Sequence, residues 1–266
     1  MAADSLLLDI GNSRVKWGIA RFEQIISGEP FSSRPDCLNT VLTCLWAHLP
    51  PPRSVWVSCV ARPEVAMALE RWIGRHWNCP VYHAQSAASA CGVSNAYREP
   101  CKLGVDRWLS LIAVRQSCTE PVCIAGCGTA LTVDLLDAGG RHLGGMISPG
   151  LKLMHDALTG GADRLKNIQA PIDFSGDSTQ ATDGLAQTTG DAITLGCLEA
   201  GLGLIERVYH RFVASHPGQG RLILTGGDAP VLARHLAVSC QVEPDLVLKG
   251  LYRLSRSSPV PLSRVD

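Results

Sequence analysis

The sequence lacks an excess of either charge. Lys plus Arg and Asp plus Glu each number 24 in 266 residues, so the formal net charge is zero. Because proteins that bind nucleic acids or membrane surfaces usually carry a basic excess or stripe, we expect neither as a partner. A run of ~20 apolar residues that could span a membrane is also missing, as is the basic and apolar start of a secretory signal. We therefore expect a cytoplasmic protein whose partner is a small molecule.

A cysteine pattern suited to disulfides or to a metal is missing as well. The chain has 11 cysteines, an odd number for a disulfide framework. Cys118, Cys123 and Cys127 lie close together, but no CxxC pair or nearby His completes a tetrahedral metal site. Cys101 has no adjacent His that would make it nucleophilic. We interpret the close cysteines as buried, reduced thiols.

Alternating strand and helix patterns predict an α/β fold in both halves of the chain. A hydrophobic content of 46% supports packed cores, and the length suits two domains. The predicted strands are 6–8, 15–20, 54–60, 121–125 and 221–224, and the predicted helices are 64–77, 105–115 and 193–214. A polar link at 116–120 places the domain boundary near 112–120.

A weak internal repeat relates the two halves. Segments 6–13 and 123–130 each contain an apolar strand, a turn with glycine at the same place, a small polar residue and the start of a second strand. A duplication would bring the turns at Gly11 and Gly128 to one ligand in a cleft between similar halves. Such turns are also common in unrelated α/β hairpins, so both interpretations stay open on this comparison alone.

The first of these turns carries groups that a triphosphate site needs. Gly11 permits close approach of the backbone, and Ser13 offers a hydroxyl. Lys16 can neutralise phosphate, and Asp9 can hold hydrated Mg²⁺. An ordinary hairpin is the alternative, but an unpartnered carboxylate at the end of a buried strand would be costly. The spacing matches neither a Walker A loop nor a GxGxxG fingerprint.

Asp106 and Arg107 stand at the start of a predicted helix. Helix capping is the usual role of Asp at such a place, and the residues alone favour it. Asp106 could instead act as a general base, with Arg107 presenting a bidentate fork to a substrate carboxylate.

An ordered set of segments resembles the type III pantothenate kinases, members of the superfamily of acetate and sugar kinases, Hsp70 chaperones and actin. The set runs through nearly the whole chain in the family's order and spacing. It comprises DIGNSRVK at 9–16, Tyr97, GVDR at 104–107, GTALTVD at 128–134, GGMISPGL at 144–151, Thr189 with Ala192 and Gly196, TGGDA at 225–229 and PDLVLKGL at 244–251.

The resemblance implies two duplicated ribonuclease-H-like domains of the actin-like ATPase type, with a cleft between them. We expect them at 1–114 and 115–266. It also implies a homodimer that phosphorylates pantothenate to 4′-phosphopantothenate with ATP and Mg²⁺, the first step of coenzyme A biosynthesis. A nucleotide-binding regulatory protein with little turnover is the alternative function. An Hsp70-like ATPase is a third, but no peptide-binding domain follows in this sequence.

The resemblance also implies roles for individual residues. Asp106 would be the catalytic proton acceptor. The ATP phosphates would contact Asp9, Ile10, Gly11, Asn12, Ser13, Arg14, Val15, Lys16 and Thr129. Pantothenate would contact Tyr97, Gly104, Val105, Asp106, Arg107 and, from the partner subunit, Thr189.

One position departs from the family pattern. The family usually has Asp-x-Gly-Thr at the second phosphate turn, and that Asp helps to bind a monovalent cation; here Gly126 takes its place. We therefore expect weak dependence on K⁺ or NH₄⁺ and assign no metal ligand. The segment 161–187 also matches poorly, and its aspartates are interpreted as a solvated loop: Asp163, Asp173, Asp177 and Asp183. His155, in a predicted helix, is interpreted as structural.

Overall fold

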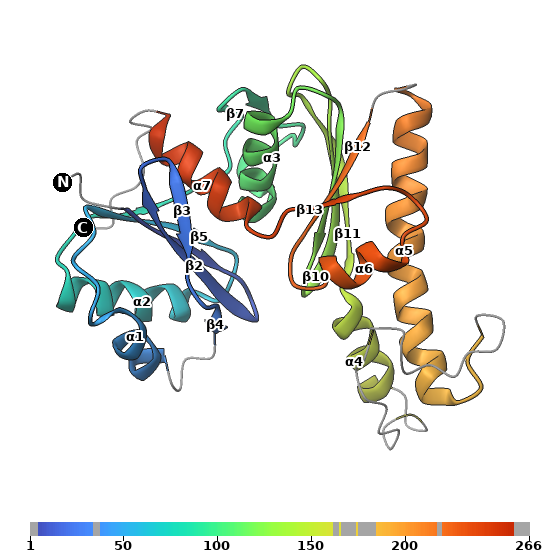
Figure 1. Ribbon diagram of the computed structural model, residues 1–266, viewed down its shortest axis with the longest axis horizontal. Coiled ribbons are helices and arrows are strands. Elements are labelled where there is room, and N and C mark those ends of the chain that lie inside the picture. The colour runs from blue at the N-terminus through green and yellow to red at the C-terminus, as the bar shows by residue number, and fades with distance from the viewer. Residues whose placement is uncertain are drawn as a thin grey trace. The chain divides into compact units, whose positions relative to one another are not determined.

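The computed structural model describes residues 5–33, 38–161, 165, 174, 185–216 and 220–257. The chain forms two compact units (Figure 1). Unit 1 comprises Met1–Thr119, Gly140–His142 and Asp245–Asp266, and unit 2 comprises Glu120–Gly139 and Leu143–Pro244.

Unit 1 is built on a mixed sheet with the strand order β3-β2-β1-β5-β6. β1 pairs antiparallel with β2 and parallel with β5, and β4 pairs with β2. The strands are β1 (Ser5–Ile10), β2 (Arg14–Arg21), β3 (Gln24–Ser27), β4 (Phe31–Ser32), β5 (Ser54–Cys59) and β6 (Val81–His83), with a separate hairpin of β7 (Ser89–Ala90) and β8 (Val93–Ser94). The helices are α1 (Leu38–Trp46), α2 (Pro63–His76), η2 (Pro100–Lys102), α3 (Val105–Ser117) and α7 (Leu246–Arg256).

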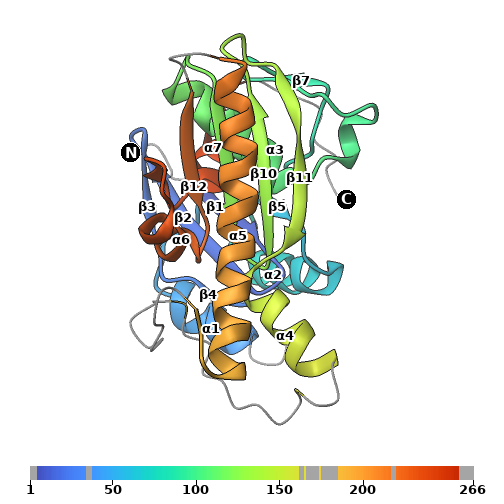
Figure 2. The ribbon, with the colours of Figure 1, turned by 90° about the vertical axis from the view of Figure 1, so that its right-hand side faces the viewer.

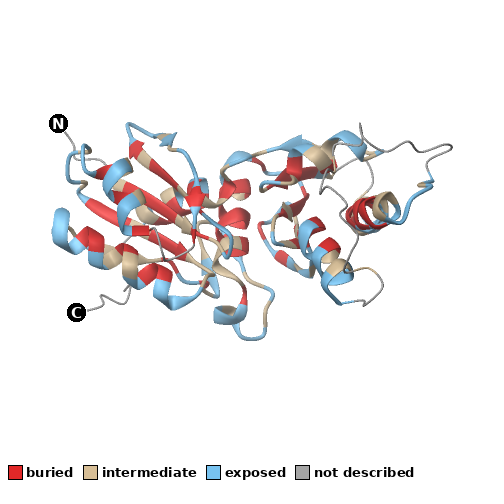
Figure 3. Ribbon diagram, turned by 90° about the horizontal axis from the view of Figure 1, so that it is seen from below, coloured by how far each residue is buried: buried red, intermediate tan, exposed pale blue. Residues whose placement is uncertain are grey.

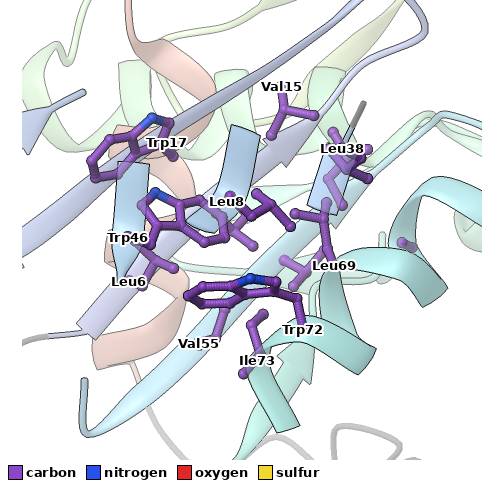
Figure 4. Packing of buried hydrophobic residues seen from close by; sticks show 14 of the residues in the cluster. Leu6, Leu8, Val15, Trp17, Leu38, Trp46, Val55, Leu69, Trp72 and Ile73 are labelled. Carbon is purple, nitrogen blue, oxygen red and sulfur yellow. The ribbon is translucent and has the colours of Figure 1, made fainter. Parts of the chain in front are cut away.

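One face of this sheet forms an aromatic core with α1 and α2. Alternation along β1 directs Leu6 and Leu8 into it, and Trp46 lies fully buried among them (Figure 4). The ring centroid of Trp46 lies 5.7 Å from those of Trp17 and Trp72, in edge-on geometry. Such pairs add about 0.5–1.5 kcal/mol each beyond their buried area. The core therefore holds β1, and with it the polar end of that strand, in a fixed position.

The other face of the sheet is covered by α3 and α7, which contact β5 and β1 (Figure 1). The two helices pack closely at Gly250, where an added Cβ would lie 1.9 Å from the Leu109 carbonyl oxygen. Only glycine permits this approach of the two backbones. The packing explains why α7, from the end of the chain, belongs to unit 1.

Unit 2 repeats the strand order of unit 1, as β11-β10-β9-β12-β13. β9 pairs antiparallel with β10 and parallel with β12. The strands are β9 (Val122–Cys127), β10 (Ala130–Leu136), β11 (His142–Pro149), β12 (Arg221–Thr225) and β13 (Gln241–Val242). The helices are α4 (Leu151–Gly161), α5 (Thr189–Ala214) and α6 (Ala229–His235).

The long helix α5 lies along one face of the unit 2 sheet (Figure 2). Its buried side includes Ile205, Val208 and Phe212, and buried residues line the inside of both units in Figure 3. The side chain of Thr188 accepts a hydrogen bond from the Asp191 N–H, so α5 begins at Thr189 instead of the predicted 193. Among the described residues, no helix is long and apolar enough to cross a membrane.

The shared strand order confirms the repeat that the sequence indicated. Both turns are closed by a glycine N–H, from Gly11 to the Arg14 carbonyl at 3.0 Å and from Gly128 to the Ala130 carbonyl at 3.1 Å. The second turn is therefore one residue shorter than the first.

The domain boundary expected between 114 and 115 falls inside α3, because that helix continues to Ser117. The units divide between Thr119 and Glu120, and the chain returns to unit 1 at Asp245. A sequence read as two consecutive halves misses this return, which the close packing of α7 on α3 produces.

Candidate active site

Three neighbouring strands of unit 1 place a row of polar side chains on one face of the sheet. Asp9 on β1 is paired with Lys16 on β2 and with Ser58 on β5. Paired residues in a sheet point to the same side. The Ser58 hydroxyl donates a hydrogen bond to Asp9 Oδ1 at 3.2 Å. The row lies next to the glycine turn, opposite the aromatic core.

The electrostatic surroundings of Asp9 are unusual for a carboxylate. The pKa of Asp9 is raised from 3.8 to about 7, chiefly by burial. The nearby carboxylates of Asp106 and Asp245 contribute to this rise, while Lys16 and the Ser58 hydrogen bond oppose it. A divalent cation would relieve both the desolvation and the repulsion between Asp9 and Asp106.

The carboxylates of this site could bind magnesium only together with further ligands from a bound nucleotide and water. The described residues contain no group of three or more His, Cys, Asp or Glu side chains that could hold a metal ion. Mg²⁺ is typically bound by one or two carboxylates together with substrate phosphates and water. Asp9 therefore fits a cation that arrives with a nucleotide.

The first turn offers backbone groups more than side chains. Ile10 and Val15, both in the predicted phosphate set, are fully buried, so only their backbone could contact a ligand. The exposed residues between them are Asn12, Ser13 and Arg14. Ser33 holds the turn, donating from Oγ to the Asn12 carbonyl at 2.8 Å and from N–H to the Ser13 carbonyl at 3.3 Å.

Asp106 lies in the first turn of α3, after the N-cap residue Gly104 and Val105. Its Oδ1 accepts the Arg107 N–H at 2.8 Å, so the carboxylate satisfies one of the N–H groups in the first turn of the helix. A Cβ on Gly104 would lie 2.7 Å from the same oxygen, so glycine leaves room for this side-chain position. Helix stabilisation and proximity to Asp9 are thus combined in one carboxylate.

Arg107 and Tyr97, both predicted to contact the substrate, are brought together. The Arg107 side chain is buried, and its Nη1 donates to the Tyr97 hydroxyl at 2.9 Å. Asn95 positions Tyr97 by accepting its N–H at 3.0 Å, and the Tyr97 ring stacks on His142 at 6.0 Å between centroids. His142 was missed by sequence reasoning, since nothing in its local sequence marks it as a neighbour of Tyr97.

In unit 2, Thr129 is exposed at the tip of the second turn. Gly150 donates its N–H to the Thr129 carbonyl at 2.9 Å and could not carry a Cβ, which would lie 1.9 Å from the Gly128 carbonyl oxygen. Gly226, with φ of 103°, packs equally closely on Cys127. Two glycines outside the turn therefore support its backbone.

Gly126, where the resemblance leads us to expect Asp, lies opposite Thr132 in the β9–β10 pair. A Cβ at Gly126 would lie 2.5 Å from Thr132 Oγ1. The hydroxyl of Thr132 thus occupies space that a side chain at 126 would need.

The remaining predicted residues have simpler surroundings. Thr189 is exposed at the first position of α5. Burial raises the pKa of Cys123 and Cys127 to about 12, which keeps both thiols protonated at neutral pH. His155 is buried in α4. The four aspartates interpreted as an acidic loop, Asp163, Asp173, Asp177 and Asp183, lie outside the described residues.

A family model described as type III pantothenate kinase matches residues 5–211. The chain belongs to the type III pantothenate kinases. A type III pantothenate kinase of Nitrosococcus oceani is 37% identical over 265 residues, covering 95% of this chain and 94% of its own length. Another, of Burkholderia thailandensis, is 36% identical over 270 residues, covering 97% and 100%. The family predicted from the ordered segments is confirmed, and with it the kinase function in coenzyme A biosynthesis.

Solved structures support the fold. A protein described as a Baf family transcriptional activator from Campylobacter jejuni aligns with a TM-score of 0.57 at 19% identity, covering 94% of this chain and 96% of its own. The activator of 2-hydroxyisocaproyl-CoA dehydratase from Clostridium difficile, with bound ADPNP, aligns with a TM-score of 0.56 at 14% identity, covering 96% and 95%. The α/β fold of the actin-like ATPase type is therefore confirmed.

Proposed function

We propose that this chain transfers a phosphoryl group from ATP to the hydroxyl of pantothenate with the polar groups of unit 1. The observation that carries the proposal is the row Lys16–Asp9–Ser58, with Asp106 within electrostatic range of Asp9. It supplies a cation, a desolvated carboxylate and a second carboxylate where the family motif predicts them. The expected cellular location is the cytoplasm.

The phosphates of ATP would be bound by the first turn. The N–H groups between Gly11 and Arg14 and the side chain of Ser13 supply donors, and Lys16 supplies positive charge. Thr129 would contact the phosphates from the second turn. Bound magnesium neutralises charge that develops on the phosphates, and Asp9 would hold it there.

Asp106 would accept the proton of the pantothenate hydroxyl as the oxygen attacks the terminal phosphorus. A base in this position contributes about 10²–10⁴-fold to the rate. Its hydrogen bond from the Arg107 N–H fixes the carboxylate, which leaves little to reorganise during the reaction.

The pantothenate carboxylate would be recognised by Arg107. Its guanidinium is held by Tyr97, both through the hydroxyl and through the ring face at 5.7 Å from centroid to Cζ. Gly104 and Val105 would line the same site through their backbone.

The dimer and its shared site also belong to the proposal. The exposed side of α5 presents small residues at Ala192, Gly196 and Gly203, and a Cβ at either glycine would meet open space. Large apolar side chains are also exposed elsewhere in unit 2, on β11 and α4: Leu143, Met146, Ile147, Leu153 and Leu158. Surfaces of this kind commonly mark subunit interfaces. Thr189, at the start of α5, would then reach the partner's substrate.

A coupled assay with pantothenate, ATP and Mg²⁺ tests the function, and we expect formation of ADP that depends on pantothenate. Binding of ATP without any turnover of pantothenate, in every salt tested, would replace the proposal with the regulatory alternative.

Mixed dimers test the shared site. Asp106→Asn and Thr189→Val subunits are each expected to be weakly active, and mixing them should recover part of the activity, because one site then has both natural residues. Demonstrably mixed dimers without recovery would refute sharing.

A further inference from the structure

The buried hydroxyl of Ser58 donates a hydrogen bond to Asp9, a carboxylate of the proposed site. Ser58 is fully buried near the end of β5, and its Oγ donates to Asp9 Oδ1 at 3.2 Å across 49 positions of sequence. The parallel pairing of β1 with β5 sets the two residues side by side. Strand pairing therefore fixes the donor, and the aromatic core beneath fixes both strands.

Two comparable hydroxyls have neutral partners. Ser54, on the same strand and the same face, lies 3.1 Å from the Ser5 hydroxyl. In unit 2, Thr225 holds the position on β12 that matches Ser58 on β5, and it donates to the Pro244 carbonyl at 3.4 Å. Among these three described hydroxyls, Ser58 is the one that donates to a carboxylate. A need for internal hydrogen bonding alone does not account for this partner.

We infer that Ser58 is a positioning residue for phosphoryl transfer, whose hydroxyl fixes one oxygen of Asp9 and so sets the direction of the other oxygen toward nucleotide-bound magnesium. This rests on the proposed function, in which Asp9 acts on the magnesium that ATP carries. A free carboxylate can rotate about its Cβ–Cγ bond, and one buried donor removes that freedom before the ligand arrives. Preorganisation of this kind improves binding without a new contact to the ligand.

Calorimetric titration with ADP tests the inference, in the presence of Mg²⁺ and again with a chelator. For Ser58→Ala we expect MgADP binding to weaken by about 10- to 100-fold, the range for a lost hydrogen bond to a charged group. Binding of ADP without magnesium should change by less than about 3-fold, because the effect passes through Asp9 and the metal. The kinase rate of Ser58→Ala at limiting Mg²⁺ should fall by a factor similar to the loss of MgADP binding.

Ser54→Ala is the matched control, since it removes a buried hydroxyl from the same face of the same strand without touching Asp9. We expect it to bind MgADP within about 2-fold of the unaltered protein. Ser58→Cys is the second loss variant, because it keeps the shape of the side chain but offers only a weak donor. It should weaken MgADP binding even if Ser58→Ala fails to fold.

Equal MgADP affinity in the unaltered protein and in the Ser58 variants would overturn the inference and leave the proposed function standing. So would an equal loss with and without magnesium, or an equal loss in Ser54→Ala, because either indicates general loosening of the sheet. An unaltered protein that binds no MgADP would overturn the proposed function and the inference together.

Discussion

The two units share a sheet but differ in the chemistry at one matched row. In both, the residue two places before the turn glycine is paired with one residue on the antiparallel neighbour and one on the parallel neighbour. These positions are Lys16, Asp9 and Ser58 in unit 1 and Thr132, Gly126 and Thr225 in unit 2. The row is charged in unit 1 and neutral in unit 2.

The difference shows that the duplicated backbone supplies two turns, whereas the side chains of one unit supply the charge. Neutral residues on β9, β10 and β12 let Thr132 fill the space beside Gly126 and let Thr225 bond to the backbone. In unit 1 the same geometry holds a carboxylate whose pKa is raised to about 7, chiefly by burial. Substitutions at matched positions can test this division.

The largest effect is expected for substitution of Asp106, the carboxylate that accompanies Asp9 in the proposed site of unit 1. Asp106→Asn keeps an oxygen that can accept the Arg107 N–H but removes the proton acceptor. Turnover should fall by about 10²–10⁴-fold with little change in melting temperature. Steady-state kinetics and thermal melting check this, with Asp156→Asn on the exposed side of α4 as the control that should keep full turnover. A stable Asp106→Asn enzyme with near-normal turnover would leave Asp106 a helix-stabilising residue only.

Much of unit 1 could be predicted because its signals are local. The hairpin around Gly11, the helix that begins at Val105 and the charged residues at both places follow from short-range patterns. Ser58 was missed because its role depends on a pairing with β1 that is 49 residues distant, although a serine inside a buried apolar strand could have raised the question. Sequence spacing alone does not show which strands pair.

The same limit applies to the end of the chain and to the second turn. The return of α7 to unit 1 depends on the contact between Gly250 and Leu109, which no local pattern encodes. The departure at Gly126 was visible in the sequence, but the filling of its space by Thr132 required the register of β9 and β10.

Removal of the buried Asp9 carboxylate should have an effect of intermediate size, measured as a change in the free energy of unfolding. Since the pKa of Asp9 is raised from 3.8 to about 7 in the folded protein, the folded state binds the proton more tightly than the unfolded state between those pH values. The free energy of unfolding should therefore fall as pH rises from about 4 to about 7, by at most ~1.4 kcal/mol per unit. Asp9→Asn should flatten this dependence and be the more stable protein at pH 8, while losing activity.

Denaturant unfolding at pH 5 and pH 8 measures this difference, with ligand-free protein. Other groups titrate in the same range, so the quantity compared is the change relative to the unaltered protein. Asp156→Asn serves again as the control, because the Asp156 side chain is 46% exposed and lies on the surface of α4, so its loss should leave the pH dependence unchanged. Parallel pH profiles for the unaltered protein and Asp9→Asn would show that Asp9 is ionised at low pH in the folded state.

The smallest effect is expected where the neutral row of unit 2 is given a charge. With Gly126 in place of the family's Asp, no carboxylate stands there to hold a monovalent counter-ion beside the phosphates. At an effective dielectric constant near 20, two charges about 4 Å apart interact by about 4 kcal/mol before solvation costs, so one carboxylate can decide whether an ion is bound. The rate of the natural protein should therefore differ by no more than about 2-fold between sodium and potassium or ammonium buffers.

Gly126→Asp should make the rate depend on potassium or ammonium. The added carboxylate would lie opposite the neutral Thr132, whereas Asp9 lies opposite the positively charged Lys16, so only the added carboxylate would need a cation from solution. Its Cβ must also displace Thr132 Oγ1, now 2.5 Å from the ideal position, and that steric cost could lower the rate by itself. Gly126→Ala is the matched control, since it adds the same Cβ without the charge and should remain independent of potassium. Comparison of the three kinase rates in each salt separates charge from crowding. Strong activation of the natural protein by potassium would mean that carbonyl oxygens hold the ion, and that the neutral row of unit 2 is not what sets the cation requirement.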